Sequence, residues 1–333
     1  MVHPSRFLTL WTAYGGMPGH WERFATHDDW RSLREFAAWD DDGEWRANFI
    51  ETEQRYLDHN PEDRYDNRAF VELAEAHREA LLHLANGPGR GCALKEFPNV
   101  LRRKADPTLK ESLKILAKHL ELVEENHDFH GHNSRWRMAD NNTRFQISVL
   151  RKRQAGTTRL RRKKVGSKVV KRLETHEGPA LERLTAGWLD ARPEEVDLAE
   201  HGVWLPDGKL ADIDALAIVG LEEDWTLVLA SCKRSAANHE PVRQRRQFEE
   251  FMAATGDSEE VLEIRRMPRR LLLVSPSFPA DKRAECGDHG FECFGIRDMA
   301  RAINLDLDRK AQSEDRHLRT RAHSGFGGDR DRS

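Results

Sequence analysis

Short apolar runs alternate with amphipathic stretches through the C-terminal half of the chain, and this alternation constrains the fold more than any other feature. The apolar runs, which are typical of strands, read "LADIDALAI", "WTLVLASCK", "RRLLLVSPSF" and "FECFGI". Between and after them lie stretches typical of helices, including "EPVRQRRQFEEFMAAT", "PADKRAECGDHG" and "RDMARAI". This order predicts an α/β domain with a mixed sheet over residues 173–308.

Acidic residues and a lysine stand at the ends of the first two apolar runs. Asp212 and Asp214 belong to the first run, and Lys233 closes the second. Two adjacent strands would bring Asp214 beside Lys233, and Asp212 would share a strand face with Asp214 because side chains two residues apart point the same way. This is the pattern of a metal-dependent phosphodiesterase site, with Asp214 as ligand for Mg²⁺ and Lys233 as catalytic cation.

One position does not fit that pattern. Such a site usually has a second carboxylate two residues before the lysine, and this position is Ser231, whose neutral hydroxyl is a weak ligand for Mg²⁺. Asp212, or Glu182 of the preceding helix "ALERL", would then have to complete the metal site. Gln244 or Gln247 of the following helix would contact DNA or a water.

Three interpretations of these residues follow. The site cleaves nucleic acid, or the domain keeps the fold and binds DNA without cutting it, or Asp214 and Lys233 form a salt bridge unrelated to nucleic acid. The sequence favours binding without cleavage slightly, because a site that needs clustered anions lacks one of them.

Residues 68–150 have the element order of a winged helix-turn-helix, with three helices followed by a β-hairpin. The third helix has an apolar stripe with steps of 4, 3 and 4 residues. The stripe consists of Leu109, Leu113, Leu116 and Leu120. The loop that holds His127, His130 and His132 would form the wing, and its polar composition predicts a solvated tip.

The first 67 residues predict a helical region rich in tryptophan. The stretch "RFLTLWTAYGGMPGHWERF" reads as a helix, a Gly-Gly break and a second helix that begins at a proline. The aromatic side chains would form a helical core or a face that docks on a partner.

Residues 151–172 carry eleven lysines or arginines and no acid. This basic connector is either a solvated linker between two domains or an arm that contacts nucleic-acid phosphates. The phosphate-contacting candidates are the four consecutive cations Arg161, Arg162, Lys163 and Lys164.

Composition sets the remaining limits. The net charge of the 333 residues is −3, so an argument for nucleic-acid binding has to rest on local charge. The four cysteines form no CxxC pair, and we find no signal peptide and no apolar run long enough for a membrane span, which together predict a reduced cytoplasmic protein. Residues 309–333 lack apolar periodicity and predict a disordered tail.

Three motifs in order resemble the C-terminal part of archaeal-type AAA ATPases. "YGGMPGHWERF" resembles the segment that follows the nucleotide-binding core, "WRMADNNTRFQ" resembles the motif that closes the winged helix, and "DIDALA" with "LASCK" resembles the PD-(D/E)xK-like domain of that family. The resemblance spans residues 7–300. It implies an α+β multidomain protein, with a helical lid-like region and winged helix followed by a restriction-endonuclease-like domain.

The chain departs from that family in having no P-loop. No G-x-x-x-x-G-K-[ST] motif occurs in the sequence, so we expect no ATPase activity from this chain. The resemblance therefore implies a DNA-binding protein, with or without Mg²⁺-dependent cleavage. The alternative is a non-enzymatic adaptor whose tryptophan-rich N-terminus docks on a partner P-loop ATPase subunit.

Overall fold

The computed structural model describes residues 3–16, 18–26, 42–60, 75–98, 108–150, 159–191, 195–205, 212–221 and 224–302. It has α+β architecture, with a two-stranded hairpin and a mixed five-stranded sheet. None of the helices within these ranges is long and apolar enough to span a membrane. The disordered tail predicted over residues 309–333 lies outside the described residues.

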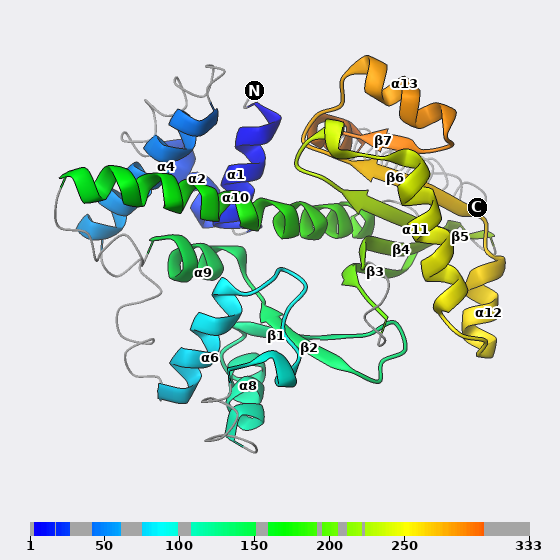
Figure 1. Ribbon diagram of the computed structural model, residues 1–333, viewed down its shortest axis with the longest axis horizontal. Coiled ribbons are helices and arrows are strands. Elements are labelled where there is room, and N and C mark those ends of the chain that lie inside the picture. The colour runs from blue at the N-terminus through cyan, green and yellow to red at the C-terminus, as the bar shows by residue number, and fades with distance from the viewer. Residues whose placement is uncertain are drawn as a thin grey trace, which may run out of the picture.

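One long helix, α10 (Arg159–Asp190), runs through the middle of the molecule and joins its parts (Figure 1). Its first half lies beside the N-terminal helices, and its second half lies on the sheet. The basic connector expected over residues 151–172 is therefore helical from Arg159 onward. Pro179 sits inside the helix, where it cannot donate a backbone hydrogen bond.

The sheet has the strand order β3-β4-β5-β6-β7, which confirms the predicted mixed sheet. The first three strands form an antiparallel meander, and β6 and β7 continue it in parallel. The strands are β3 (Glu195–Val203), β4 (Ile213–Leu221), β5 (Asp224–Cys232), β6 (Arg269–Val274) and β7 (Glu292–Phe294). The turn expected at Pro206 lies outside the described residues.

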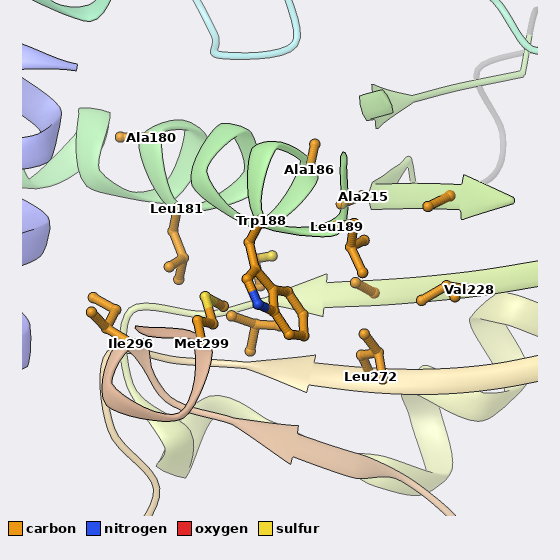
Figure 2. Packing of buried hydrophobic residues seen from close by; sticks show 14 of the residues in the cluster. Ala180, Leu181, Ala186, Trp188, Leu189, Ala215, Val228, Leu272, Ile296 and Met299 are labelled. Carbon is orange, nitrogen blue, oxygen red and sulfur yellow. The ribbon is translucent and has the colours of Figure 1, made fainter. Parts of the chain in front are cut away.

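Helices cover both faces of this sheet. Figure 2 shows Leu181 and Trp188 of α10 pointing toward the strands that carry Val228 and Leu272. On the opposite face, α11 buries aromatic side chains such as Phe251 against the sheet. The helices between and after the strands are α11 (Pro241–Ala254), α12 (Glu259–Arg266), α13 (Ala280–Asp288) and the helical residues 296–302.

The described part of the N-terminal region is helical as expected, and its aromatic side chains share a core with α9 (Asn141–Phe145), η3 (Gln146–Leu150) and α10. Helix α1 (Pro4–Tyr14) ends at Gly15 with φ of 59°, α2 (Pro18–Thr26) begins at a proline, and α4 (Asp42–His59) follows. Trp45 is fully buried and stacks on Phe49 with ring centroids 5.5 Å apart. Trp45 is therefore a core residue and not part of an exposed docking face. Trp30 and Trp39 lie outside the described residues.

The elements of residues 75–138 occur nearly in the expected order, with a short 3₁₀ turn in place of the second helix. They are α6 (Glu75–Asn86), the 3₁₀ turn η2 (Leu94–Glu96), α8 (Thr108–Lys118), β1 (Val123–His127) and β2 (Ser134–Met138), followed by α9 (Asn141–Phe145) and the π-helical turn η3 (Gln146–Leu150). Leu109, Leu113 and Leu116 are buried as predicted. The prediction for Leu120 was wrong: α8 ends at Lys118, so Leu120 leaves the helical stripe and is 41% exposed.

The tip of the β1–β2 hairpin packs against the C-terminal part of the chain. The backbone N–H of Phe129 donates to the carbonyl of Trp204 at 3.0 Å, and its ring meets Phe251 of α11 edge-on at 5.8 Å. The prediction of a solvated wing tip was therefore wrong at Phe129, because α11 offers this apolar ring an aromatic partner. His127 and His132 on the same hairpin remain exposed.

A buried carboxylate holds distant segments to α10. Glu177 has no exposed area and accepts hydrogen bonds from Arg46 of α4 at 3.0 and 3.2 Å, from Thr9 of α1 at 2.6 Å and from Arg234 after β5 at 2.8 Å. Each of these groups would be costly to bury alone, and together they compensate one another. The N-terminal helices and the loop after β5 are therefore fixed to the same turn of α10.

We predict that Glu177→Gln destabilises the protein by about 3 kcal/mol, because it leaves Arg46 buried without its counter-charge. Glu174→Gln is the matched control. Glu174 lies one turn earlier on α10, is 32% exposed and contacts the same two arginines only at 3.9 Å, so we expect its loss to cost less than about 1 kcal/mol. Urea unfolding measures both, and equal effects would contradict the role given to Glu177.

Candidate functional site

The structure brings Asp214 and Lys233 together where β4 begins and β5 ends. The Nζ of Lys233 lies 3.3 Å from Oδ2 of Asp214. Asp214 is the second residue of β4, and the pairing of β4 with β5 aligns Ala215 with Ala230, which brings Asp214 to the last residues of β5 and so to Lys233. The predicted pair is therefore formed by backbone register, and Lys233 is still 40% exposed at the surface.

Oδ2 of Asp214 accepts two further hydrogen bonds from the end of β5. The backbone N–H of Cys232 donates at 2.7 Å, and the hydroxyl of Ser231 donates at 3.2 Å. Together with Lys233, these groups give one carboxylate oxygen three donors from three consecutive residues. Ser231 therefore does not replace a metal-binding carboxylate but acts as a donor to Asp214.

Ser231 belongs to a buried chain of polar groups that reaches β6. Nε2 of Gln244 lies 2.9 Å from Oγ of Ser231 and 2.8 Å from Nδ1 of His239. Nε2 of His239 lies 3.2 Å from the carbonyl of Val274 and 3.1 Å from Oγ of Ser275.

The direction of every proton in this chain follows from one carbonyl. The carbonyl of Val274 can only accept, so Nε2 of His239 carries the ring proton and Nδ1 accepts from Gln244. The second amide proton of Gln244 goes to Ser231, whose own proton is then directed to Asp214. Burial lowers the pKa of His239 to about 4, which agrees with a neutral ring.

Lys233 is positioned through its neighbours on both sides. Its backbone carbonyl accepts from Oγ of Ser275 at 2.7 Å, and its N–H donates to the carbonyl of Val274 at 2.9 Å. The next residue, Arg234, is bound to the buried Glu177. The ammonium group of Lys233 therefore stands on a fixed backbone although its side chain is partly exposed.

Glu182 of α10 interacts electrostatically with Asp214 and Lys233 of this site. Burial is the main cause that raises the pKa of Glu182 to about 8, and the negative charges of Asp214 and Asp212 also raise it. The positive charges of Lys233 and Arg137 partly oppose this shift. Near neutral pH its carboxyl group is therefore largely protonated.

Two arginines pair with Asp212, so its carboxylate is not free to bind a metal together with Asp214. Its Oδ2 lies 3.7 Å from Nη1 of Arg90 and 3.7 Å from Nη1 of Arg135. Burial raises the pKa of Asp212, and these two arginines oppose the shift. The expectation that Asp212 substitutes for the missing carboxylate beside Asp214 has no support in this arrangement.

These residues do not fit a Mg²⁺ ion as they stand. A hard divalent cation needs several anionic or carbonyl oxygens that are free to bind it. One oxygen of Asp214 already takes three donors, and Asp212 pairs with two arginines. Across the part of the chain that the structure describes, no group of three or more His, Cys, Asp or Glu side chains could hold a metal.

The residues expected to contact nucleic acid fall into two groups. Arg161, Arg162, Lys163 and Lys164 lie in the first turns of α10. Gln244, in contrast, is only 4% exposed and belongs to the buried chain, so it cannot reach DNA; this expectation was wrong because the side chain points at Ser231. Gln247 donates to the backbone carbonyl of Asp212 at 3.1 Å.

Sequence reasoning missed His239 and Ser275, which complete the buried chain. His239 stands before α11 and Ser275 stands just after β6, and neither belongs to a spaced motif. The only sequence signal for either residue is its position. His239 lies shortly before α11 and Ser275 directly follows β6, at the edge of the sheet where polar side chains collect.

The chain matches no protein-family model, and comparisons with curated proteins and with solved structures likewise found no match.

The raised pKa of Glu182 predicts a pH-dependent stability. A carboxyl group whose folded pKa lies above its unfolded value of about 4.5 stabilises the fold only while it is protonated, so this contribution is lost as the pH rises toward about 8. Glu182→Gln removes the titration. We expect the variant to gain on the order of 2 kcal/mol over wild type at pH 9 and much less at pH 5.

Thermal unfolding at both pH values measures this difference. Glu263→Gln, which changes an exposed carboxyl group of α12, is the control. A gap between Glu182→Gln and wild type that stays constant from pH 5 to pH 9 would contradict the assignment.

Proposed function

We propose that the chain is a nucleic-acid-binding protein with a restriction-endonuclease-like domain that does not cleave, related to archaeal-type AAA ATPases through its winged-helix and nuclease-like regions. The observation that carries the absence of cleavage is that one carboxylate oxygen of Asp214 is already occupied by donors from β5 and Lys233. Its Oδ2 takes donors from Ser231, Cys232 and Lys233 where an active site would present a free ligand. The antiparallel meander followed by two parallel strands is compatible with the proposed domain.

The basic first half of α10 supports nucleic acid as the partner. Residues 159–172 contain eight cations and no acid, and at about 1.5 Å per residue they extend over roughly 20 Å of helix. Single-sign charge of this density is an electrostatic footprint for a phosphate backbone.

Helix α8 offers a second cationic face. Lys110, Lys114 and Lys118 follow one another at four-residue spacing, and Lys110 and Lys118 are exposed. Residues four apart lie on the same side of a helix. In a winged helix-turn-helix this helix would enter the major groove of DNA. Because the hairpin tip packs against the rest of the chain, α8 is the element of that region that remains available for DNA.

The adaptor alternative draws less support. A docking face needs exposed aromatic side chains, but Trp45 is fully buried and Trp21 donates from Nε1 to the carbonyl of Gly15 at 2.9 Å inside the N-terminal core. Among the described residues of this region, the aromatic rings therefore stabilise the chain itself.

We predict that the wild-type protein neither nicks nor cuts DNA with Mg²⁺ or Mn²⁺, and that Asp214→Asn binds a DNA duplex within about twofold of wild type. An amide at this position keeps an oxygen for Cys232 and Ser231. Supercoil relaxation and fluorescence anisotropy measure the two quantities. Metal-dependent nicking by wild type that disappears in Asp214→Asn would overturn the proposal.

The salt dependence of DNA binding tests the basic helix. Log Kd should change linearly with log salt, with a slope of about 0.9 for each phosphate neutralised. A quadruple variant carries Arg161→Ala, Arg162→Ala, Lys163→Ala and Lys164→Ala. We expect it to reduce the slope by up to about 3.6, because each lost contact releases one counterion fewer.

The control for lost charge replaces four exposed arginines on other helices. It carries Arg243→Ala, Arg246→Ala, Arg266→Ala and Arg297→Ala. Equal slopes for the two quadruple variants would show that the first half of α10 does not contact phosphates.

A further inference from the structure

A cationic pocket lies between α10 and the glycine-rich loop that follows α6, away from the Asp214 site. Its volume is about 480 Å³, which is within the range of small-molecule binding sites. Asn86 at the end of α6 and the loop residues 87–89 form one wall, and the others include Arg144, Lys171, Arg172 and His176.

Three nitrogen atoms that belong to this lining are buried without a hydrogen-bond partner. They are Nε of Arg144, Nε of Arg172 and Nδ1 of His176. Buried polar groups are nearly always paired, so three orphans in one pocket require an explanation. An anion bound in the pocket would offset the charge of these two guanidinium groups.

The tautomer of His176 follows from its neighbours. The hydroxyl of Ser148 donates to the carbonyl of Arg144 at 2.6 Å, so it must accept from Nε2 of His176 at 2.8 Å. Nδ1 is then bare. Burial lowers the pKa of His176 to about 3, and the charges of Arg144 and Arg172 act in the same direction, so the ring is neutral without a ligand.

The charge of the pocket is uncompensated among its lining residues. Arg144, Lys171 and Arg172 contribute three cations, and no carboxylate is among the described residues that line the cavity. Burial lowers the pKa of Arg144 to about 10, which reflects how little solvent or counter-charge reaches this guanidinium. An anion in the pocket would offset this electrostatic cost.

The loop wall is held in place by close contacts with side chains of α10 and with Arg144. A Cβ atom at Gly89 would lie 2.0 Å from the ring of Pro179 on α10, so only glycine fits there. The carbonyl of Gly87 accepts from Nη2 of Arg144 at 2.8 Å, and Arg172 donates to the side chain of Asn86. The pocket is therefore bounded by fixed elements and does not depend on a loose surface loop.

We propose that this pocket binds a phosphate group, held by the guanidinium groups of Arg144 and Arg172 and by the ammonium group of Lys171. Guanidinium and ammonium donors pair with phosphate oxygens through short, charge-assisted hydrogen bonds. The phosphate belongs either to a nucleic-acid backbone or to a free phosphate ester. The first source rests on the proposed function, and the second does not.

Calorimetric titration of the full chain with inorganic phosphate, and separately with adenosine 5′-monophosphate, tests the site without DNA. Lys171→Gln is the variant, because Lys171 is exposed and its loss leaves the fold intact. Arg266→Gln removes one exposed cation from α12 and is the matched control. We expect Lys171→Gln to weaken phosphate binding about threefold to tenfold, a double Lys171→Gln/Arg172→Gln variant to weaken it further, and Arg266→Gln to leave it unchanged.

A competition experiment separates the two sources. Phosphate that displaces a DNA duplex from wild type, but much less from Lys171→Gln, supports a backbone phosphate in the pocket. Phosphate that binds without affecting DNA supports a free phosphate ester. Absence of phosphate binding by wild type, or equal affinities for Lys171→Gln and Arg266→Gln, would overturn the proposal, and neither result depends on whether the chain binds DNA.

Discussion

The buried carboxylate of Glu177 is the constraint on which the arrangement of the molecule depends. It has no contact with solvent and takes donors from α1, α4 and the loop after β5. Removing such charges from water is costly, and the cost is offset only when all partners are in place. Three segments far apart in the sequence therefore have to meet α10 at one turn, and this requirement fixes both the N-terminal core and the backbone around Lys233.

The same logic governs the candidate site. A functional metal site keeps carboxylate oxygens free, whereas Asp214 shares one oxygen among three donors. The buried hydrogen-bond chain from Val274 through His239 and Gln244 sets the direction of the Ser231 proton, so the Ser231 hydroxyl donates to Asp214. An arrangement of this kind stabilises an ionised Asp214 beside Lys233 and is suited to holding the strand ends together.

The sequence predicted the parts of this structure that depend on local pattern. The apolar runs located β4, β5 and β6, and their spacing brought Asp214 to Lys233. It did not predict β3 (Glu195–Val203), because an edge strand of the sheet is partly exposed and carries acids and a histidine that hide its alternation. Ser231 was recognised as a departure, but its role was not, because Gln244 and His239 reach it only through tertiary packing.

Long-range contacts also explain the other differences. The docking of Phe129 on α11 depends on an aromatic partner more than a hundred residues away, and no local signal in a polar loop reveals it. The cationic pocket combines a glycine-rich loop after α6 with Arg144 and with α10, so its three cations look unrelated along the chain. In each case the sequence showed the type of residue, but it did not show which distant residue that side chain contacts.

The most direct test of the account is ultraviolet cross-linking of a bound DNA duplex, followed by mass-spectrometric mapping of the cross-linked peptides. Binding through the basic helix predicts cross-links concentrated in residues 159–172, with a pattern that does not change when Mg²⁺ is added. Cross-links concentrated between Asp212 and Lys233, and enhanced by Mg²⁺, would contradict the claim that this chain binds nucleic acid without using Asp214 as a metal ligand.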